Sequence, residues 1–216
     1  MSSYIQHMRS VRAARPAKKP KDQYHHGDLR RALLQAAVRT IQKHGFSALT
    51  LRAVGDELGV SRTALYRHFA DKSALLTAVA AEGFRMLRVD LETAWDGGCQ
   101  GLPSLTAMGE AYVRFALGNP WHYRVMFGSG FELVATDPEL IEEGNAAFQT
   151  LADALLALQT QKHVRQDDLS TQANFVWSVV HGVAMLAMDG SFEHRVSDLS
   201  AFARYAVERL ATGIAS

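Results

Sequence analysis

The sequence predicts an all-α fold, in which a small N-terminal group of three helices precedes a larger helical region. Apolar residues recur every three or four positions along most of the chain, which is the spacing of one face of an α-helix. Glycines end several of these runs, and Ser, Thr or Asp residues begin them, as expected of helix ends. No segment alternates apolar and polar residues for long enough to predict a strand.

Length and composition are those of an ordinary globular protein. The 216 residues are 48% hydrophobic, enough to bury a core in one or two domains. No run approaches the roughly 20 apolar residues that cross a bilayer, and the first residues lack the apolar centre of a secretory signal. We therefore expect a cytoplasmic protein with no membrane partner. The lone Cys99 has no second cysteine to pair with, and we interpret it as an incidental small residue.

The first helix is predicted over residues 28–44 and is preceded by a basic segment. Its apolar residues recur four apart and share one face: Leu33, Ala37 and Ile41, joined by Leu29, Leu34 and Val38. Gly45 then ends the helix. Residues 1–23 carry six Arg and Lys residues and few large apolar groups, so we expect a flexible basic arm.

Two short helices are predicted next. Thr50 is placed to cap a helix over residues 51–58, which Gly59 ends. Ser61 can cap a third helix, whose Leu65 and Phe69 lie four apart on the buried side. A short glycine-containing turn between two short helices, braced by a longer helix in front, indicates a helix-turn-helix.

Further helices are predicted over the remainder. Asp71 caps a long helix reaching toward Trp95, and others are expected at about 103–118, 138–160, 167–189 and 196–213, with a short one through residues 123–127. The chain thus divides into the arm (1–23), the helix-turn-helix unit (24–72) and a helical domain (73–216).

Charge is segregated along the chain although the net charge is only +1. Residues 1–72 carry 14 Lys and Arg against 5 Asp and Glu, a net +9, whereas residues 73–216 carry 9 against 17, a net −8. A basic N-terminal third attached to an acidic remainder is typical of a polyanion-binding module joined to a separate domain, although chance segregation of solvated charges gives the same pattern.

The third helix carries the candidate residues for reading DNA bases. The N-terminal residues of such a helix face base edges in the major groove, and here they are residues 61–64, beginning with Ser61. The outer faces carry Arg62, Thr63, Tyr66 and Arg67. Arg62 can bond guanine bidentately, and either Ala64 or the Thr63 methyl group can touch the methyl group of thymine. Arg52 can reach the same groove. Thr50, Tyr66, His68 and Lys72 are better suited to phosphates. Any one of these arginines could instead be a solvated surface charge.

The stretch "ALTLRAVGDELGVSRTALYRHFADKSALL", residues 48–76, resembles the signature of the TetR family of repressors. The resemblance implies an N-terminal three-helix DNA-binding domain, a divergent helical ligand-binding domain and a homodimer. Carried over by position, the family's DNA-contacting residues fall on Thr50, Arg52, Arg62, Thr63, Tyr66, His68 and Lys72. The implied partners are a double-stranded DNA operator, a second copy of the chain and an unidentified small-molecule effector.

A second resemblance covers the C-terminal region. "NPWHYRVMFGSG" (119–130) and "WSVVHGVAML" (177–186) are similar to a TetR C-terminal subgroup named for a Trp-His-Gly motif, here Trp177, His181 and Gly182. Soft and aromatic residues in these segments are candidates for an effector pocket: Trp121, Tyr123, Met126, Phe127, Trp177, His181 and Met185. The alternative is that this stripe is ordinary core and that His181 is a hydrogen-bonded core histidine.

Dimerisation is expected because one short recognition helix reads only a few base pairs, and a two-fold axis repeats the reading one DNA turn away. The last two helices, rich in alanine, are the expected interface.

An effector-independent repressor or an architectural protein of the same fold is the alternative function. An enzyme is not expected, since no nucleophile elbow, phosphate loop or His-Glu-x-x-His motif is found. No cofactor is expected, and metal sensing has no ligand set to support it.

Overall fold

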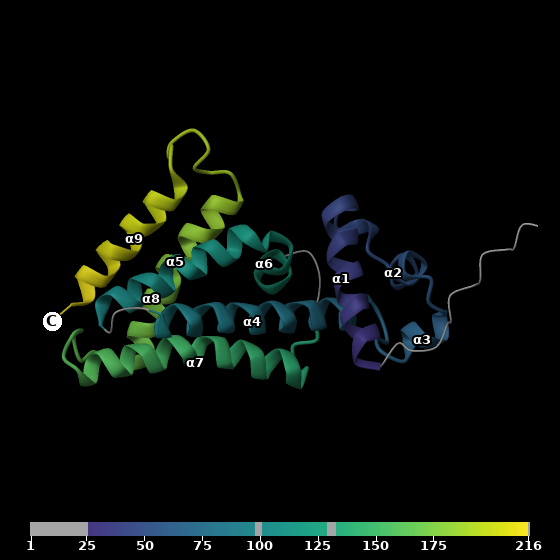
Figure 1. Ribbon diagram of the computed structural model, residues 1–216, viewed down its shortest axis with the longest axis horizontal. Coiled ribbons are helices and arrows are strands. Elements are labelled where there is room, and N and C mark those ends of the chain that lie inside the picture. The colour runs from purple at the N-terminus through teal and green to yellow at the C-terminus, as the bar shows by residue number, and fades with distance from the viewer. Residues whose placement is uncertain (1–25, 98–100, 129–132, 216) are drawn as a thin grey trace, which may run out of the picture.

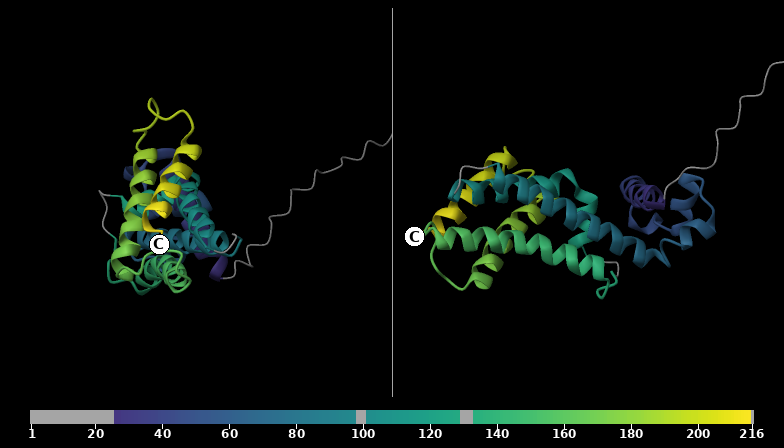
Figure 2. Two further views of the ribbon diagram at one scale, coloured as in Figure 1. Left: turned by 90° about the vertical axis from the view of Figure 1, so that its left-hand side faces the viewer. Right: turned by 60° about the horizontal axis from the view of Figure 1, so that its bottom comes forward.

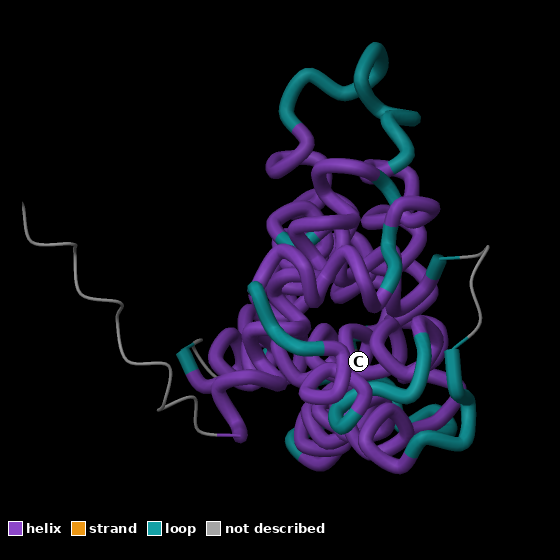
Figure 3. Tube along the Cα trace, turned by 90° about the vertical axis from the view of Figure 1, so that its right-hand side faces the viewer, coloured by secondary structure: helices purple, strands orange, loops and turns teal. Residues whose placement is uncertain are grey.

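The computed structural model describes residues 26–97, 101–128 and 133–215, and these form an all-α structure, as predicted. Figure 3 shows helices and connecting loops throughout the described part of the chain, where the sole β-type pairing is one bridge between Val164 and Ala215. The predicted basic arm and Cys99 lie outside the described residues.

The three N-terminal helices are α1 (His26–His44), α2 (Leu51–Leu58) and α3 (Arg62–Tyr66), with a single 3-10 turn, η1 (Phe46–Ala48), after α1. They lie together at one end of the molecule (Figure 1). The predicted cap residues begin two of them: Thr50 Oγ1 accepts the amide of Ala53 at 3.0 Å, and Ser61 Oγ accepts that of Ala64 at 3.2 Å. Gly59 ends α2 in the left-handed conformation, with φ of 66°, which glycine adopts without steric cost.

The core of this unit is formed by the predicted apolar faces. Leu33, Ile41, Val54, Leu65 and Phe69 are all at most 3% exposed. Helix α3 is shorter than the spacing of Leu65 and Phe69 suggests, because it ends at Tyr66 and continues as a turn in which Phe69 N–H still bonds the Leu65 carbonyl at 3.1 Å. The two residues therefore keep the four-residue spacing that buries them together.

Helix α4 (Lys72–Asp96) connects the two parts of the molecule. Asp71 caps it by accepting the amide of Ala74 at 2.8 Å. Its first turns bury Leu75, Leu76 and Val79 in the same core as α1, and its later turns pack against α5, α6 and α7. Figure 2 shows α4 running from the N-terminal helices into the C-terminal bundle, so a displacement at either end can be carried along one continuous helix.

The C-terminal bundle contains α5 (Leu102–Gly118), α6 (Pro120–Phe127), α7 (Pro138–Thr160), α8 (Leu169–Met188) and α9 (Leu199–Ile214). The predicted ranges agree with these bounds to within three residues. Asp137, Asp168 and Asp198 cap α7, α8 and α9. Helices α4 and α7 run side by side (Figure 1). None of the described helices combines the length and apolar character needed to cross a bilayer.

Close approach of α5 and α9 depends on Gly109. A Cβ atom at this position would lie 2.6 Å from Val207 Cγ1, well inside van der Waals contact. Glycine therefore allows the backbone of α5 to pack directly against the Val207 side chain of α9, which is 2% exposed.

Candidate functional site

The N-terminal end of α3 presents a polar surface to solvent. Arg62, Thr63, Tyr66 and Arg67 are exposed, and Tyr66 retains 57% of its accessible area. A large aromatic residue exposed to this degree on a short helix has no packing function, so its hydroxyl and ring are available to a partner. Arg52, Arg62 and Tyr66 line one shallow hollow between α2 and α3, which Leu51, Gly55, Asp56, Val60 and Leu65 complete.

Gly55 sets the spacing of α2 and α3. A Cβ atom there would lie 3.2 Å from Leu65 Cδ1, so a larger residue would require the Leu65 side chain to shift at the contact between the two helices. Gly55 was not singled out from the sequence. Its position after Val54, on the buried face of a predicted helix, was the available signal.

The other predicted DNA-binding residues have additional roles. Thr50 and Ser61 use their hydroxyl oxygens to cap helices, and each still has its own hydroxyl proton to donate. Lys72 is half-buried, and its ammonium group donates to the Phe46 carbonyl at 2.7 Å. This bond fixes η1 to the start of α4 and leaves two ammonium protons for other acceptors. His68 is half-buried beside the ring of Phe69.

Arg52 forms an ion pair one helical turn along α2. Its Nε lies 3.5 Å from Asp56 Oδ2, and both side chains are more than 70% exposed. Ion pairs that are this solvated contribute little free energy, so the guanidinium can exchange Asp56 for another acceptor at small cost.

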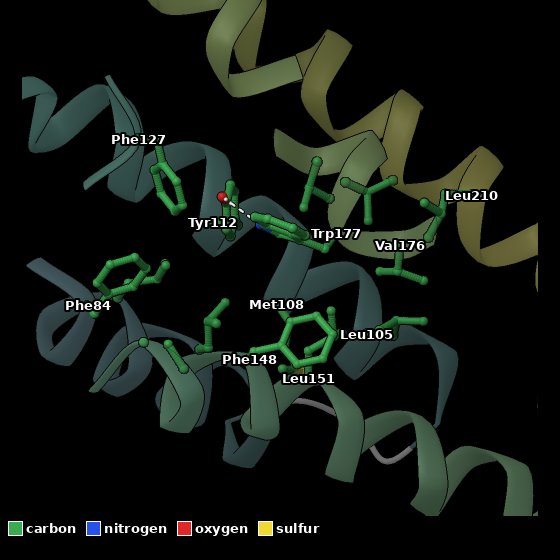
Figure 4. Close-up of a pocket in the computed structure, with 17 residues that line it drawn as sticks. Phe84, Leu105, Met108, Tyr112, Phe127, Phe148, Leu151, Val176, Trp177 and Leu210 are labelled. Atoms are coloured by element: carbon green, nitrogen blue, oxygen red, sulfur yellow. Dashed lines mark hydrogen bonds between the residues drawn. The ribbon is translucent and has the colours of Figure 1, made fainter. Parts of the chain in front are cut away.

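A cavity of about 260 Å³ lies inside the C-terminal bundle. Its lining residues come from all six helices α4–α9, and Figure 4 shows their side chains converging on it. They are Phe84, Leu87, Leu91, Leu105, Met108, Gly109, Tyr112, Phe127, Gly144, Ala147, Phe148, Leu151, Val176, Trp177, Val180, Val207 and Leu210.

Four aromatic and imidazole side chains form a hydrogen-bonded cluster at one wall of this cavity. Trp177 Nε1 donates to the Tyr112 hydroxyl at 3.2 Å, and the Tyr112 and Tyr123 oxygens are 3.1 Å apart. His181 Nδ1 lies 3.0 Å from the Tyr112 oxygen and 2.7 Å from the Tyr123 oxygen. The polar atoms at this wall are therefore bonded to one another.

Burial keeps this cluster uncharged at neutral pH. It raises the pKa of Tyr112 to about 12, raises that of Tyr123 further above its ordinary value, and lowers the pKa of His181. In each case desolvation disfavours the charged form. The wall thus offers neutral hydroxyl, indole and imidazole groups.

Only some of the predicted pocket residues line the cavity. Phe127 and Trp177 line the cavity, and Tyr123 and His181 lie behind its wall in the hydrogen-bonded cluster. Trp121, Met126 and Met185 are not among the lining residues: the Trp121 ring lies under the Arg124 guanidinium, Met126 is 7% exposed, and Met185 is half-buried against the core.

Most of the cavity wall was not singled out from the sequence. Phe84, Met108, Tyr112 and Phe148 line it from α4, α5 and α7. Each lies at an ordinary helical apolar position, which periodicity alone cannot distinguish from solid core.

Ion pairs join α7 to the N-terminal unit. Arg30 of α1 bonds Glu139 of α7 at 2.6 Å, and its guanidinium lies 5.7 Å from the centre of the Phe69 ring. Arg85 of α4 also bonds Glu139 at 2.8 Å and bonds Glu143 at 2.7 Å. We call the Arg30–Glu139 pair the α1–α7 latch. It connects the helix-turn-helix core directly to a helix that lines the cavity.

No group of three or more metal-ligating side chains is found in the described part of the chain.

Residues 33–79 match the bacterial regulatory proteins of the TetR family, and residues 105–210 match the tetracyclin repressor-like C-terminal domain. The chain belongs to the TetR family. Members of this family are DNA-binding transcriptional regulators and not enzymes, so the basic N-terminal unit is its DNA-binding domain.

Solved structures of similar proteins include one from Rhodococcus sp. RHA1 described as a protein of unknown function. It is 31% identical, covers 92% of this TetR-family chain and 100% of its own, and superposes with a TM-score of 0.79. PfmR, a TetR-family regulator from Thermus thermophilus, is 19% identical over 83% of this chain and 97% of its own, with a TM-score of 0.63.

FadR, a fatty acid degradation regulator from Bacillus halodurans, is 15% identical, covers 84% of this chain and 94% of its own, and has a TM-score of 0.68. At these low identities PfmR and FadR support the fold of the TetR-family chain only.

Proposed function

We propose that this TetR-family regulator is a homodimeric repressor that binds a palindromic operator and responds to a small molecule held in its C-terminal domain. In this proposal residues 24–72 bind DNA and residues 73–216 hold the effector and dimerise. The observation that carries it is the apolar cavity of about 260 Å³, which α4 and α7 connect to the DNA-binding end. A cavity of this kind, with few polar groups, is the usual form of a small-molecule site.

The DNA-reading surface supports a division of labour. Arg52 and Arg62 line the same hollow beside the exposed end of α3, where a helix inserted in the major groove meets base edges. Thr63 and Arg67 flank them, with Ser61 at the helix N-terminus. Thr50, Tyr66, His68 and Lys72 are assigned to phosphates, which fix the register without reading sequence.

A stripe on α8 supports a homodimer. Phe175 and Leu186 are 51% and 48% exposed, and Val179 and Gly182 lie between them at helical spacing. Tyr205 on the neighbouring α9 is 54% exposed. A second copy related by a two-fold axis would cover this apolar surface with the same surface of its own.

We also propose that the C-terminal domain belongs to the Trp-His-Gly subgroup. The Trp177 and His181 rings are 5.5 Å apart on successive turns of α8, and both take part in the hydrogen-bonded cluster at the cavity wall. Gly182 does not face this cluster. A Cβ atom there would have no neighbour within 4 Å, so the α8 backbone is open to close approach by a second copy at this position.

Helix α7 offers a physical route from effector to DNA. Gly144, Ala147 and Phe148 line the cavity, and on the N-terminal side of them Glu139 bonds Arg30 of α1 and Glu143 bonds Arg85 of α4. An effector that binds more tightly when α7 is displaced relative to α4 shifts the population toward that arrangement. The α1–α7 latch then changes the position of the DNA-binding unit.

Footprinting of the purified protein on genomic DNA tests this function. We expect a palindromic site bound by the wild type, with operator affinity changed by compounds that raise the melting temperature. Arg62→Ala should lose base preference, whereas Arg114→Ala, an equal charge change on the exposed side of α5, should not. Sites without symmetry would contradict the dimeric repressor. Specific binding that no stabilising compound alters would favour the effector-independent alternative.

A further inference from the structure

The wall of the C-terminal cavity contains no charged side chain. Of its 17 lining residues, only Tyr112 and Trp177 carry a side-chain hydrogen-bonding group, and none is Asp, Glu, Lys, Arg or His. An ionised ligand group placed here would lose its hydration without gaining a counter-charge, and would therefore bind poorly.

The two polar groups at the wall already have partners inside the protein. The Trp177 indole N–H is bonded to the Tyr112 oxygen, and the Tyr112 hydroxyl lies within bonding distance of both Tyr123 and His181. An apolar ligand therefore leaves no polar atom of the wall without a hydrogen-bond partner. Neither Tyr112 nor His181 supplies a charge, because burial keeps each in its neutral form.

Aromatic rings from four helices form much of the wall. Phe84 and Phe127 meet edge-on with centroids 5.4 Å apart, Phe148 and Trp177 do so at 6.2 Å, and Figure 4 shows these four side chains among those around the cavity. Edges and faces of aromatic rings favour a flat aromatic guest in offset or perpendicular contact.

The volume indicates the size of a guest that would fill the cavity. A cavity of about 150 Å³ accommodates benzene, so by proportion the 260 Å³ here suits about ten non-hydrogen atoms. From these observations we propose that the effector is an uncharged, hydrocarbon-rich molecule of about this size, such as a fused two-ring aromatic. This inference rests on the proposed effector function, and it names the chemical class for that same site.

Gly144 provides the variant for the test. A Cβ atom there would be 4.0 Å from the Phe84 ring, so a leucine side chain at this position would extend into the cavity. Gly118, at the exposed end of α5, has nothing within 4 Å of its Cβ direction and serves as the matched control. Gly144→Ala is the milder second variant, used if Gly144→Leu lowers the helical content or the operator affinity.

Binding of naphthalene, 2-naphthol and 2-naphthoate to the full-length protein should be measured by calorimetry and by thermal shift. The three probes share one ring system, and only 2-naphthoate is charged at neutral pH. We expect the two neutral probes to bind and to raise the melting temperature, and 2-naphthoate to bind at least about tenfold more weakly. Gly144→Leu should weaken neutral-probe binding about tenfold or more, Gly144→Ala less, and Gly118→Leu should leave it unchanged.

The outcomes separate this inference from the proposed function. If 2-naphthoate binds as tightly as 2-naphthol, or if neither neutral probe binds, the inferred ligand class is overturned. If neutral probes bind in a manner sensitive to Gly144→Leu but leave operator affinity unchanged, the class stands and the sensing function loses its support. If a charged compound both binds in the cavity and changes operator affinity, the function stands and the class is wrong.

Discussion

Breaking the α1–α7 latch should change operator affinity without removing any contact to DNA. Arg30→Gln, Glu139→Gln and the double variant form a thermodynamic cycle that isolates the pair. The glutamines keep most of the side-chain volume and remove the charges. Since Arg30 lies in α1 and Glu139 in α7, 109 residues away, the cycle reports on the connection between the DNA-binding unit and the cavity.

The size of the effect follows from the exposure of the two side chains. They are 36% and 37% exposed, so solvent screens the pair, and pairs of this kind contribute about 0.2–1 kcal/mol. Arg30→Gln also removes the contact with the Phe69 ring, about 0.5–1 kcal/mol, and Glu139→Gln also removes the bond to Arg85. Each single variant should therefore lose about 0.5–2 kcal/mol, a fall of roughly 1–8 °C in melting temperature for a chain of this length.

Two measurements at one fixed protein concentration test the reasoning. Urea unfolding should give a coupling energy of about 0.2–1 kcal/mol, smaller at high salt. Operator titrations should show a change in affinity of up to about fivefold, about the same energy expressed as an equilibrium constant, with an unchanged salt slope because no phosphate contact is lost. Arg204→Gln and Glu110→Gln, which break a comparable pair between α9 and α5, serve as the control. A coupling energy of zero, or equal changes in operator affinity for the control pair, would refute the latch.

Three further predictions concern the DNA surface, the aromatic cluster and the dimer. Arg62→Ala should weaken binding to the cognate site by about 1–3 kcal/mol and relax the base preference. Lys72→Ala should weaken binding to all sequences alike and reduce the salt slope by about one. Identical losses on cognate and random DNA for both variants would contradict the assignment of Arg62 to bases and Lys72 to phosphates. Because the pKa of Tyr112 is raised to about 12 in the folded state and is about 10 when unfolded, its contribution is constant below pH 10 and falls by up to about 3 kcal/mol as the pH rises toward 12. Alkaline unfolding curves should show this fall, and Tyr112→Phe should make it shallower without removing it, because the raised pKa of Tyr123 lowers stability over the same pH range; a variant curve parallel to that of the wild type would count against it. Phe175→Glu should produce monomers in sedimentation experiments, because it places a charge in the apolar stripe of α8, whereas Val89→Glu on an exposed position of α4 should not; a dimer that survives Phe175→Glu would exclude this interface.

The N-terminal unit could be predicted closely from the sequence because its signals are local. Thr50, Ser61 and Asp71 each cap a helix three residues before the amide they bond, and such short-range chemistry is visible in the order of residues alone. The buried faces of α1 and α2 follow from spacing in the same way. Lys72 shows the limit of this approach, because its bond to the Phe46 carbonyl joins residues 26 positions apart.

The cavity could be predicted only in part because it is a product of packing between six helices. Phe127 and Trp177 were singled out as aromatic residues and do line it, but Trp121, six residues before Phe127, packs under Arg124 instead. Tyr112 and Phe148 have the same helical spacing as solid-core residues. Whether an apolar side chain packs in the solid core or lines a cavity depends on its neighbours on other helices. The spacing of apolar residues along one helix carries no information about those neighbours.

The close packing of α5 and α9 at Gly109 also affects how two copies of the protein would be arranged. Because a Cβ atom at this position would lie 2.6 Å and 2.8 Å from the two methyl carbons of Val207, a residue larger than glycine would force α5 and α9 apart. In a dimer built on α8 and α9, such a shift of α9 would change the orientation of one protomer relative to the other. Over the length of α4 such a rotation would alter the separation of the two recognition helices, so the half-site spacing of the operator would be encoded partly by a glycine that touches neither DNA nor the second subunit.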